Sequence, residues 1–462
     1  MNLAYAELLN IPACRMKFQG DSDVLSFSVT GFATDSRTIQ SGQAFIALQG
    51  EKFDGHQFIA DLRAAGITNF IVSQSWYNSA SPATGDSNLF IVDDTLNALQ
   101  EIARYYRLKF SIPLIALTGS NGKTTTKEMI GSVLAEKFDV LKNKGNLNNH
   151  IGVPLSLLEI ANQHEIAVIE MGTNHFGEIA RLAEIANPTA GLITNIGPAH
   201  LEFFGSLQGV YQAKTELWRY LEKQENTVAF VNADDPFLSK DNPLGVQVIT
   251  FGFEHRADVS GQFLDLDEQG RPSFKTQGVE IALGIAGMHN IYNALAAVAV
   301  GLEFGVNIQQ IKVALERFLP SSKRMEVIRS NDIMVINDCY NSNPESARKA
   351  ILTLSQVQTT GKRIAVLADM LELGAQAEQE HEGIGDFIAS LNNIDYLLTY
   401  GALSALTSAQ AQQLTKIQSH HFGTRKELIA TLRHIIGKDD VILIKGSRGM
   451  AMEEVTKGII EP

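Results

Sequence analysis

The sequence predicts an α/β protein of three domains, built around a central parallel-sheet P-loop domain with an α/β domain before it and a Rossmann-like domain after it. The chain has 462 residues, which is too long for one ordinary core. Apolar strands alternate with helices through its middle and last parts, as in parallel sheets. A glycine loop, Thr118–Thr125, joins an apolar strand to a helix and has the composition of a phosphate-binding loop.

The first domain is expected to cover residues 1–94 and to mix short strands with turns. Ala44–Leu48, Phe70–Ser73 and Leu89–Val92 are apolar runs of strand length. A polar loop rich in Ser, Gly and Asp, from Asn78 to Asn88, separates the last two runs. These features predict a small α/β unit.

The second domain, residues 95–320, shows the regular alternation that predicts a mostly parallel sheet covered by helices on both faces. The expected strands are Leu114–Leu117, Ile166–Glu170 and Ala190–Ile196, and the expected helices are Leu96–Tyr106, Lys123–Phe138 and Glu178–Ile185. The stretch from Ala257 to Val279 is instead interpreted as irregular strand and turn.

The glycine loop carries the groups that bind phosphate. Backbone N–H groups of such a loop point toward a phosphate, and the N-terminus of the next helix adds partial positive charge. Lys123 can reach the terminal phosphates, and the Thr124 hydroxyl can bind Mg²⁺. The common pattern has about four residues between its glycines, whereas this loop has only Ser120 and Asn121. The short loop argues against a generic ATPase, and an ordinary glycine turn is the structural alternative.

Two polar residues follow strands of this domain. Glu170 ends one predicted strand, and His200 comes just after another. Ligands of open α/β sheets bind at the carboxyl ends of the strands, so Glu170 is well placed to hold a metal beside the phosphate loop. The alternative interpretations are a solvated cap for Glu170 and a structural role for His200.

Three further residues of the second domain are candidates. Lys214 is expected on a helix, where a surface lysine is the ordinary interpretation. Asn290 and Asn293 open a later helix, lie three residues apart and therefore share one face, which suits recognition of a nucleobase edge. A helix N-cap would explain one of these asparagines but not both.

The third domain, residues 321–462, repeats the alternation of strands and helices and is therefore expected to be Rossmann-like. Its predicted strands are Ile333–Asn337, Arg363–Leu367, Tyr396–Leu398 and Val441–Ile444. Polar groups follow the first and last of these strands, where a ligand site would need them, although an Asn-rich turn and solvated basic residues are the alternatives. These groups are Asp338, Tyr340, Asn341, Asn343, Lys445, Ser447 and Arg448.

Composition excludes several classes of protein. Apolar residues make up 45% and charged residues 19%, a globular balance. With 38 basic and 51 acidic residues the net charge is −13, which disfavours non-specific nucleic-acid binding. Cys14 and Cys339 lie in different contexts and are expected as reduced thiols. No long apolar segment or signal sequence is apparent, so we expect a soluble, cytoplasmic protein without membrane insertion.

Taken together and in order, these segments resemble the Mur ligases, the ATP-dependent amide ligases of bacterial cell-wall synthesis. The shortened loop is that family's own variant of the phosphate loop, and the resemblance spans essentially the whole chain. It is closest to the branch that joins D-alanyl-D-alanine to UDP-N-acetylmuramoyl-tripeptide. The segments that carry it are Gly145–Pro154, Glu170–Glu178, His200–Gly205 and Lys445–Arg448.

The resemblance implies roles for individual residues. The catalytic residues would be Lys123, Glu170, His200 and Lys214. ATP would be bound by Thr118, Gly119, Ser120, Asn121, Gly122, Lys123, Thr124, Thr125, Asn290, Asn293, Arg324, Asp338 and Tyr340. Two Mg²⁺ ions would be held by Thr124, Glu170, His200 and Lys214, the last carbamylated as in much of the family. The substrates would contact Ser36, Arg37, Asn146, Asn148, Asn149, Asn341, Asn343, Lys445, Ser447 and Arg448.

The resemblance also implies a reaction and its partners. The N-terminal segments Thr34–Arg37, Phe45–Gly50 and Phe53–His56 look like the family's UDP-binding module. A peptide carboxylate, with meso-diaminopimelate or L-lysine as third residue, would attack ATP to form an acyl phosphate that the amine of D-alanyl-D-alanine then attacks. We expect small-molecule partners and a monomer. The alternatives are a sister ligase that adds a single amino acid, a folylpolyglutamate synthase-like ligase, and a non-enzymatic nucleotide switch.

Overall fold

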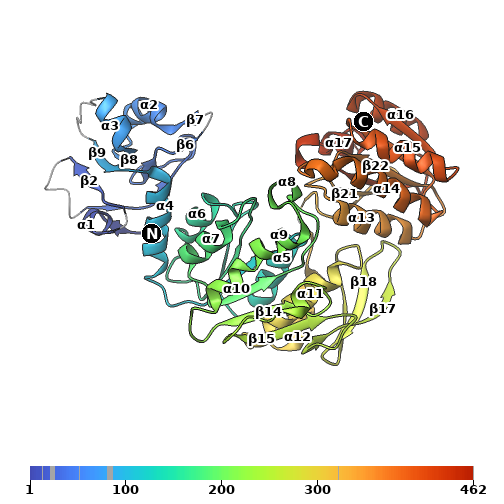
Figure 1. The fold of residues 1–462 in the computed structure, drawn as a ribbon, viewed down its shortest axis with the longest axis horizontal. Coiled ribbons are helices and arrows are strands. Elements are labelled where there is room, and N and C mark those ends of the chain that lie inside the picture. Colours follow the sequence, from blue (N-terminus) through green and yellow to red (C-terminus); the bar gives the residue numbers. More distant parts are fainter. Residues whose placement is uncertain (13, 21–26, 51–52, 81–86, 321, 461–462) are drawn as a thin grey trace.

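The computed structural model describes residues 1–12, 14–20, 27–50, 53–80, 87–320 and 322–460. Three large sheets of five, seven and six strands follow one another along the chain. Figure 1 shows the seven-stranded sheet in the middle, with the N-terminal part of the chain on one side and the C-terminal part on the other. The α/β fold class predicted from the sequence is confirmed by the structure.

The N-terminal sheet has the strand order β2-β9-β8-β5-β4, parallel except for the antiparallel edge strand β2. Its two faces pack on different helices, with α2 and α3 on one and α1 and α4 on the other. The strands are β2 (Lys17–Gln19), β4 (Phe32–Ala33), β5 (Ala44–Ile46), β8 (Asn69–Ser73) and β9 (Asn88–Val92), with the small pairs β1 (Leu3–Ala4) with β3 (Ser28–Val29) and β6 (Gln49–Gly50) with β7 (Phe53–Asp54). The helices are α1 (Tyr5–Leu9), η2 (Gly55–Phe58), α2 (Ile59–Ala64), α3 (Gln74–Ala80) and α4 (Thr95–Arg107).

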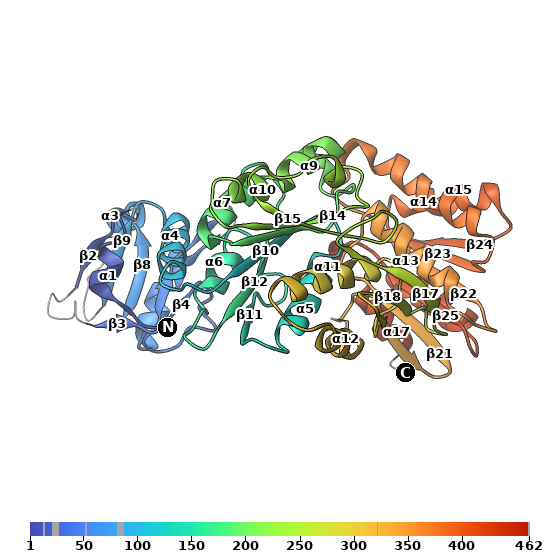
Figure 2. The same ribbon diagram turned by 90° about the horizontal axis from the view of Figure 1, so that it is seen from below.

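The central sheet is parallel throughout, in the order β11-β12-β10-β13-β14-β15-β16. A parallel sheet needs cover on both faces, and Figure 2 shows it between α7, α9 and α10 on one side and α5, α11 and α12 on the other. The strands are β10 (Leu114–Thr118), β11 (Val140–Lys142), β12 (Ile166–Glu170), β13 (Ala190–Ile193), β14 (Val228–Asn232), β15 (Gln247–Gly252) and β16 (Val259–Ser260), followed by the antiparallel β17 (Gln262–Leu266), β18 (Pro272–Thr276) and β19 (Val279–Ala282). The helices are α5 (Lys123–Leu134), α6 (Gly152–Leu157), α7 (Glu178–Ala186), α8 (Leu201–Phe204), α9 (Leu207–Lys214), α10 (Glu216–Leu221), η3 (Leu238–Lys240), α11 (Asn290–Glu303) and α12 (Ile308–Arg317).

The C-terminal sheet has the order β20-β21-β25-β22-β23-β24, with only β20 antiparallel to its neighbour. Helices α13 and α14 cover one face, and α16 and α17 cover the other. The strands are β20 (Glu326–Ser330), β21 (Ile333–Asp338), β22 (Arg363–Ala368), β23 (Tyr396–Tyr400), β24 (Gln418–Phe422) and β25 (Val441–Lys445). The helices are α13 (Pro344–Gln356), η4 (Gly374–Gln376), α14 (Ala377–Leu391), α15 (Ser404–Leu414), α16 (Arg425–Ile435), η5 (Arg448–Met450) and α17 (Glu453–Ile460).

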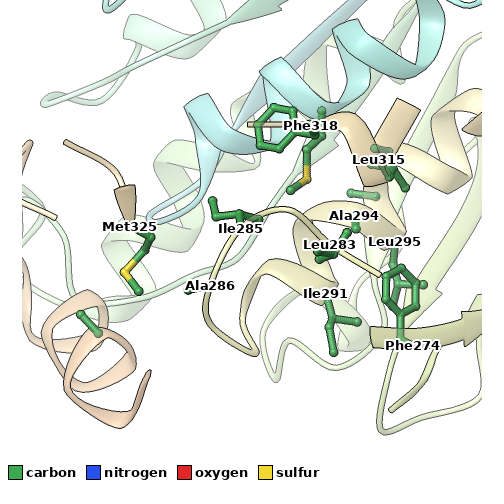
Figure 3. Packing of buried hydrophobic residues seen from close by; sticks show 14 of the residues in the cluster. Phe274, Leu283, Ile285, Ala286, Ile291, Ala294, Leu295, Leu315, Phe318 and Met325 are labelled. Carbon is green, nitrogen blue, oxygen red and sulfur yellow. The ribbon is translucent and has the colours of Figure 1, made fainter. Parts of the chain in front are cut away.

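Apolar contacts continue from one sheet region to the next and so fix how the regions meet. The core around α4 joins the N-terminal sheet to the central one through side chains such as Leu99 and Ile169. The core around α11 extends into the C-terminal region, and Figure 3 shows Met325 beside Ile285 and Ala286. Burial of apolar side chains stabilises these junctions. Among the described residues, no helix has the length and apolar character needed to cross a membrane.

Two predicted elements, a helix and a strand, end earlier than the sequence pattern suggested. Helix α5 stops at Leu134 and not at Phe138, because the chain tightens into a turn in which the N–H of Lys137 donates to the carbonyl of Leu134 at 3.0 Å, three residues back instead of four. Strand β13 stops at Ile193, since Thr194 turns to the phosphate loop. The predicted polar loop was wrong for 78–80, which belong to α3, while 81–86 lie outside the described residues. The segment 257–279 forms β16, β17, β18 and the start of β19.

Candidate active site

One large cavity, of about 870 Å³, lies at the carboxyl ends of the central strands, where the C-terminal region faces them. Its central wall comes from the phosphate loop and from the ends of β12, β13 and β14. Its other wall comes from the ends of β21 and β25 and from the first turns of α13. In Figure 1 this meeting place lies between α8 and α11 of the central region and α13 of the C-terminal region. The cavity is therefore shared between two sheets.

The phosphate loop needs glycine at both of its ends. Gly119 has φ 145° and lies against Thr194. Gly122 has φ 77°, and a Cβ added to it would lie 2.5 Å from the side-chain oxygen of Asn293. A residue with a side chain would meet both a left-handed backbone and a neighbouring side chain at these positions. The contacts with Thr194, after β13, and with Asn293, on α11, thus restrict the loop to one shape. Helix α5 begins directly after it, at Lys123.

Lys123 rests on the loop itself. Its Nζ donates to the carbonyl oxygens of Gly119 at 2.7 Å and Ser120 at 3.2 Å. Burial lowers the pKa of this lysine, the nearby Arg324 lowers it further, and Glu170 opposes the change. The ammonium therefore lies among backbone oxygens at the cavity wall, where a phosphate oxygen could replace them.

Glu170, at the end of β12, is almost completely buried and is held on both carboxylate oxygens. The Thr124 hydroxyl donates to Oε2 at 2.8 Å, and Nδ2 of Asn148 donates to Oε1 at 2.8 Å. Lys127 brings its Nζ within 3.9 Å of Oε2. The side chain of Asn143 bonds both the N–H and the carbonyl of Glu170. This hydroxyl and carboxylate pair presents the oxygen ligands that Mg²⁺ prefers.

The asparagines after β11 have different tasks. Asn148 holds the carboxylate of Glu170, whereas Oδ1 of Asn149 accepts from the N–H groups of Ile151 and Gly152 and so caps α6. Asn146 lines the cavity together with both of them.

Lys214, the last residue of α9, is 1% exposed. No hydrogen bond or ion pair involves its ammonium in the described part of the chain. Burial, reinforced by Lys123, lowers the pKa of Lys214 well below its usual value, although Glu178 and Glu216 oppose this. A buried amine of this kind favours its neutral form, which is the form that reacts with CO₂.

His200 faces the C-terminal region. Its Nδ1 lies 2.7 Å from Oε2 of Glu372, in the loop after β22, and this contact lowers the pKa of Glu372. His200 itself has a left-handed backbone, with φ 53°. Within the described ranges, no three His, Cys, Asp or Glu side chains gather into a ready metal cluster. Mg²⁺ sites at phosphates commonly use only one or two carboxylates and complete the shell with phosphate and water.

The asparagine pair begins α11, as expected. Nδ2 of Asn293 donates to Oδ1 of Asn290 at 2.8 Å, and Nδ2 of Asn290 donates to the carbonyl of Ala286 at 2.7 Å. Thr126, on the phosphate-loop helix, donates to Oδ1 of Asn293 at 3.0 Å. Burial lowers the pKa of the adjacent His289 to about 3, with Lys349 and Lys445 adding to the effect. The pair is thus fixed to the phosphate-loop helix.

The C-terminal wall gathers the predicted charged residues. The guanidinium of Arg324 stacks 3.8 Å from the ring centre of Tyr340. Oδ1 of Asp338 accepts from the N–H of Met325 at 3.1 Å, and Oδ2 accepts from the buried Nζ of Lys445 at 2.6 Å. Lys445 also donates to the carbonyl of Asn341 at 3.0 Å. This arrangement places a guanidinium and an ammonium, both suited to phosphate or carboxylate oxygens, opposite the phosphate loop.

Comparison with known proteins agrees with this geometry. Residues 28–107 match the model of the Mur ligase family catalytic domain, residues 117–301 the Mur ligase middle domain, and residues 323–448 the Mur ligase glutamate ligase domain. The UDP-N-acetylmuramoyl-tripeptide–D-alanyl-D-alanine ligase of Bacillus subtilis is 38% identical over 437 residues, which cover 94% of this chain and 93% of that protein. The chain belongs to the Mur ligase family.

Two solved structures of Mur ligases are also similar over their whole length. A crystal structure of MurF from Acinetobacter baumannii has a TM-score of 0.90 and 33% identity, and the match covers 100% of this chain and 99% of that one. The MurF ligase of Thermotoga maritima in complex with ADP has a TM-score of 0.80 and 28% identity, with 93% and 97% covered.

Not every residue predicted for this Mur ligase lies at the cavity. Ser36 and Arg37 belong to the N-terminal region, and Arg37 is exposed and pairs with Asp35 at 2.6 Å. This pair lowers the pKa of Asp35 to about 2. Ser447 bonds the N–H of Leu371 and the carbonyl of Ser342, and Arg448 is exposed, 5.8 Å from the ring centre of Tyr340. Neither is among the described residues that line the cavity.

Sequence reasoning missed four residues that shape the site of this Mur ligase. Lys127 and Asn143 support Glu170, and Glu345 and Lys349 lie on α13 at the cavity wall. Lys127 could have been found from its place one helical turn after Lys123, on the same face of α5. The others have no local signal, because their role depends on segments far away in the sequence.

Proposed function

We propose that this chain is an ATP-dependent ligase that joins D-alanyl-D-alanine to UDP-N-acetylmuramoyl-tripeptide. One observation carries the proposal. The chain is similar over nearly its full length to ligases of that name, and its phosphate loop and a C-terminal wall with basic residues line the same cavity. ATP is the nucleotide that such a ligase consumes, in line with the ADP bound to the Thermotoga maritima relative.

The residues of this chain fit ATP and Mg²⁺. The phosphate loop from Thr118 to Thr125 would hold the phosphates, and the Asn290 and Asn293 pair would contact adenine. Thr124 and Glu170, already 2.8 Å apart, would hold one Mg²⁺. His200 and a carbamylated Lys214 would complete a second site with Glu170. Bound Mg²⁺ supplies positive charge that offsets the repulsion between phosphates and an attacking carboxylate.

The first chemical step is the activation of the tripeptide carboxylate. A carboxylate oxygen forms a bond to the γ-phosphorus as the bond from that phosphorus to the β-γ bridging oxygen breaks, which yields an acyl phosphate and ADP. Lys123 lies at the phosphate loop and would offset charge on the transferred group. Arg324, stacked on Tyr340, would do so from the C-terminal wall. The task of these residues is orientation and electrostatic stabilisation.

The second step is the formation of the amide. The amine of D-alanyl-D-alanine attacks the acyl carbon, loses a proton, and inorganic phosphate leaves with the electron pair of the broken carbon–oxygen bond. The acyl phosphate must be kept from water, which a C-terminal domain docked on the phosphate loop would achieve. Residues 1–94 would bind the UDP part, residues 95–320 ATP, and residues 321–462 would close the site. We expect small-molecule substrates and a monomer.

A product assay tests the function. The purified chain with ATP, Mg²⁺, UDP-N-acetylmuramoyl-tripeptide and D-alanyl-D-alanine should give the UDP-pentapeptide, identified by its mass. Single amino acids, and folate with glutamate, serve as competing acceptors and test the sister ligases. Release of ADP without any acceptor would instead indicate a nucleotide switch and would contradict the proposal.

Lys123 provides the first variant for this assay. Lys123→Ala should lower product formation by about a thousandfold, because the substitution removes a positive charge beside the phosphates. Lys144→Ala, in the exposed loop after β11, is the control, since Lys144 is 75% exposed and pairs with Glu159. Near-normal turnover in Lys123→Ala would remove Lys123 from the mechanism.

A further inference from the structure

The first turn of α13 contacts the phosphate loop directly. Asn121 uses both ends of its side-chain amide for this contact: Nδ2 donates to Oε2 of Glu345 at 2.8 Å, and Oδ1 accepts from Nδ2 of Asn343 at 2.7 Å. The same carboxylate also lies against Gly197, where a Cβ added to the glycine would meet its oxygen. A carboxylate of the C-terminal region therefore lies against the loop that binds phosphate.

Lys349 follows one helical turn after Glu345 and forms an ion pair with the other carboxylate oxygen, Oε1. The two side chains are 35% and 28% exposed, and both residues line the active-site cavity. Lys349 is also close enough to His289 to help lower the pKa of that imidazole. His289 adjoins Asn290, at the proposed adenine end of the site. The ammonium thus lies at the cavity wall, beside the carboxylate that contacts the phosphate loop.

The negative charge of Glu345 is unfavourable beside a loop that binds phosphate. A carboxylate at hydrogen-bonding distance from the phosphate loop repels a polyphosphate, and its charge helps to raise the pKa of Asp235 beside the cavity. A partly exposed ion pair between residues four apart on a helix is weak. A triphosphate carries more negative charge than one carboxylate, so it can replace Glu345 as the partner of Lys349.

We propose that Lys349 is a phosphate-binding residue supplied by the C-terminal domain. Glu345 pairs with the Lys349 ammonium until the phosphates of ATP replace the carboxylate as its partner. Glu345 acts as a stand-in anion that keeps α13 docked on Asn121 and keeps the ammonium oriented toward the cavity. The exchange of partners couples nucleotide binding to the position of the C-terminal domain. The proposal rests on the proposed ATP site and adds a residue to it.

Nucleotide affinity without acceptors tests the exchange. Calorimetry with the β,γ-imido analogue of ATP and Mg²⁺ should show a dissociation constant about tenfold higher for Lys349→Met, because one charged phosphate contact is lost. Glu345→Gln should lower it about fivefold, since the competing anion is gone. In the double variant the gain from Glu345→Gln should disappear, because Lys349 is then absent. AMP should bind all four forms with equal affinity.

A matched pair on α12 provides the control. Lys312 and Glu316 are also four residues apart, form an ion pair at 3.0 Å and are each 32% exposed, away from the cavity. Lys312→Met and Glu316→Gln should leave the affinity unchanged. If Lys349→Met does not fold, Lys349→Arg replaces it, and this charge-preserving variant should bind the analogue as the unsubstituted chain does.

Two results would overturn the exchange. One is an unchanged affinity in Lys349→Met, or an affinity lost in Lys349→Arg. The other is a Glu345→Gln gain that persists without Lys349, which would mean that the carboxylate acts on the phosphates alone. Because no acceptor is present, these results are independent of ligase activity. A chain that binds the analogue as expected and yet forms no pentapeptide would contradict the proposed function and leave the exchange standing.

Discussion

The two walls of the active-site cavity are built to different degrees of rigidity. On the central wall, Glu170 is 1% exposed and receives hydrogen bonds from Thr124 and Asn148, while Asn143 fixes its backbone on both sides. Every polar atom of this carboxylate has a partner within one compact region. Such support preorganises a site and limits its motion. The central wall is therefore already in place around Glu170.

The C-terminal wall is held by contacts that can exchange. Its pair of Glu345 with Lys349 is partly exposed, and Glu345 reaches the phosphate loop through Asn121. The segment that leads into it has left-handed backbone at Lys323 and Met325, with φ 65° and 49°. Backbone strain at non-glycine residues often marks a hinge or a switch. The cavity thus has a fixed half, the central wall, and a docked half, the C-terminal wall, whose contacts can change.

Among the residues near the central wall other than Lys123, substitution of Lys214 is expected to lower activity most. We expect the neutral amine of this buried lysine to react with CO₂ to form a carbamate, with release of a proton. Lys214→Met should lose more than about a hundredfold in activity, because the anion that would help to hold Mg²⁺ can no longer form. Carbon-13 NMR of the chain in labelled bicarbonate should show a carbamate signal that is absent in Lys214→Met.

Lys127 is the matched control for this measurement. It is as deeply buried as Lys214, but its Nζ donates to the carbonyl of Asn143 at 2.7 Å and lies 3.1 Å from Glu128. These two contacts already engage its amine, so we do not expect Lys127 to form a carbamate. Lys127→Met should therefore keep the carbamate signal. A signal that survives in Lys214→Met would place the carbamate elsewhere.

Asn148 and Asn149 test whether metal binding at the central wall depends on the hydrogen bonds to Glu170. Asn148→Ala removes the donor to Oε1 of Glu170, and we expect Mn²⁺, used as a probe for Mg²⁺, to bind about 10- to 100-fold more weakly with the ATP analogue present. Electron paramagnetic resonance of free Mn²⁺ measures this affinity.

Asn149→Ala is the control from the same loop. It removes the cap of α6, which costs about 1 kcal/mol of stability, and should leave the Mn²⁺ affinity near normal. Equal losses of affinity in both variants would mean that the loop acts as one unit and that Asn148 has no special role.

The same contrast explains what the sequence could predict. Strand β12 ends at Glu170 as expected, because buried parallel strands are continuous apolar runs and a charged residue ends the run. Lys123, Thr124 and Glu170 therefore came together through a local rule about strand ends. The pairing of Asn121 with Glu345 joins residues 224 positions apart, and no local pattern encodes such a contact.

Local chemistry was also ambiguous where one residue type serves several tasks. Asn148 and Asn149 are adjacent and identical in sequence terms, yet one supports Glu170 and the other caps a helix. Only the path of the chain after β11 separates the two roles. The placement of Ser36 and Arg37 away from the cavity likewise depends on how the N-terminal sheet packs, which α4 decides through its apolar contacts.

His289, where the two halves meet, gives the smallest expected effect and a direct test of docking in solution. Its pKa is about 3 in the folded chain, through burial and through Lys349 and Lys445 of the C-terminal wall, against about 6.5 when unfolded. Below pH 6.5 His289 binds a proton in the unfolded chain but not in the folded chain. The free energy of unfolding therefore falls as the pH drops toward 3. At pH 5 the loss amounts to about 2 kcal/mol.

Urea unfolding at pH 7 and pH 5 measures this loss. His289→Gln should lose about 2 kcal/mol less stability between the two pH values than the unsubstituted chain, whereas His420→Gln, on the exposed side of β24, should not differ from it. Lys349→Met should recover part of the loss, because one of the two cations near the imidazole is gone. If Lys349→Met has no effect while His289→Gln does, Lys349 does not act on His289, and α13 is not docked near it in solution.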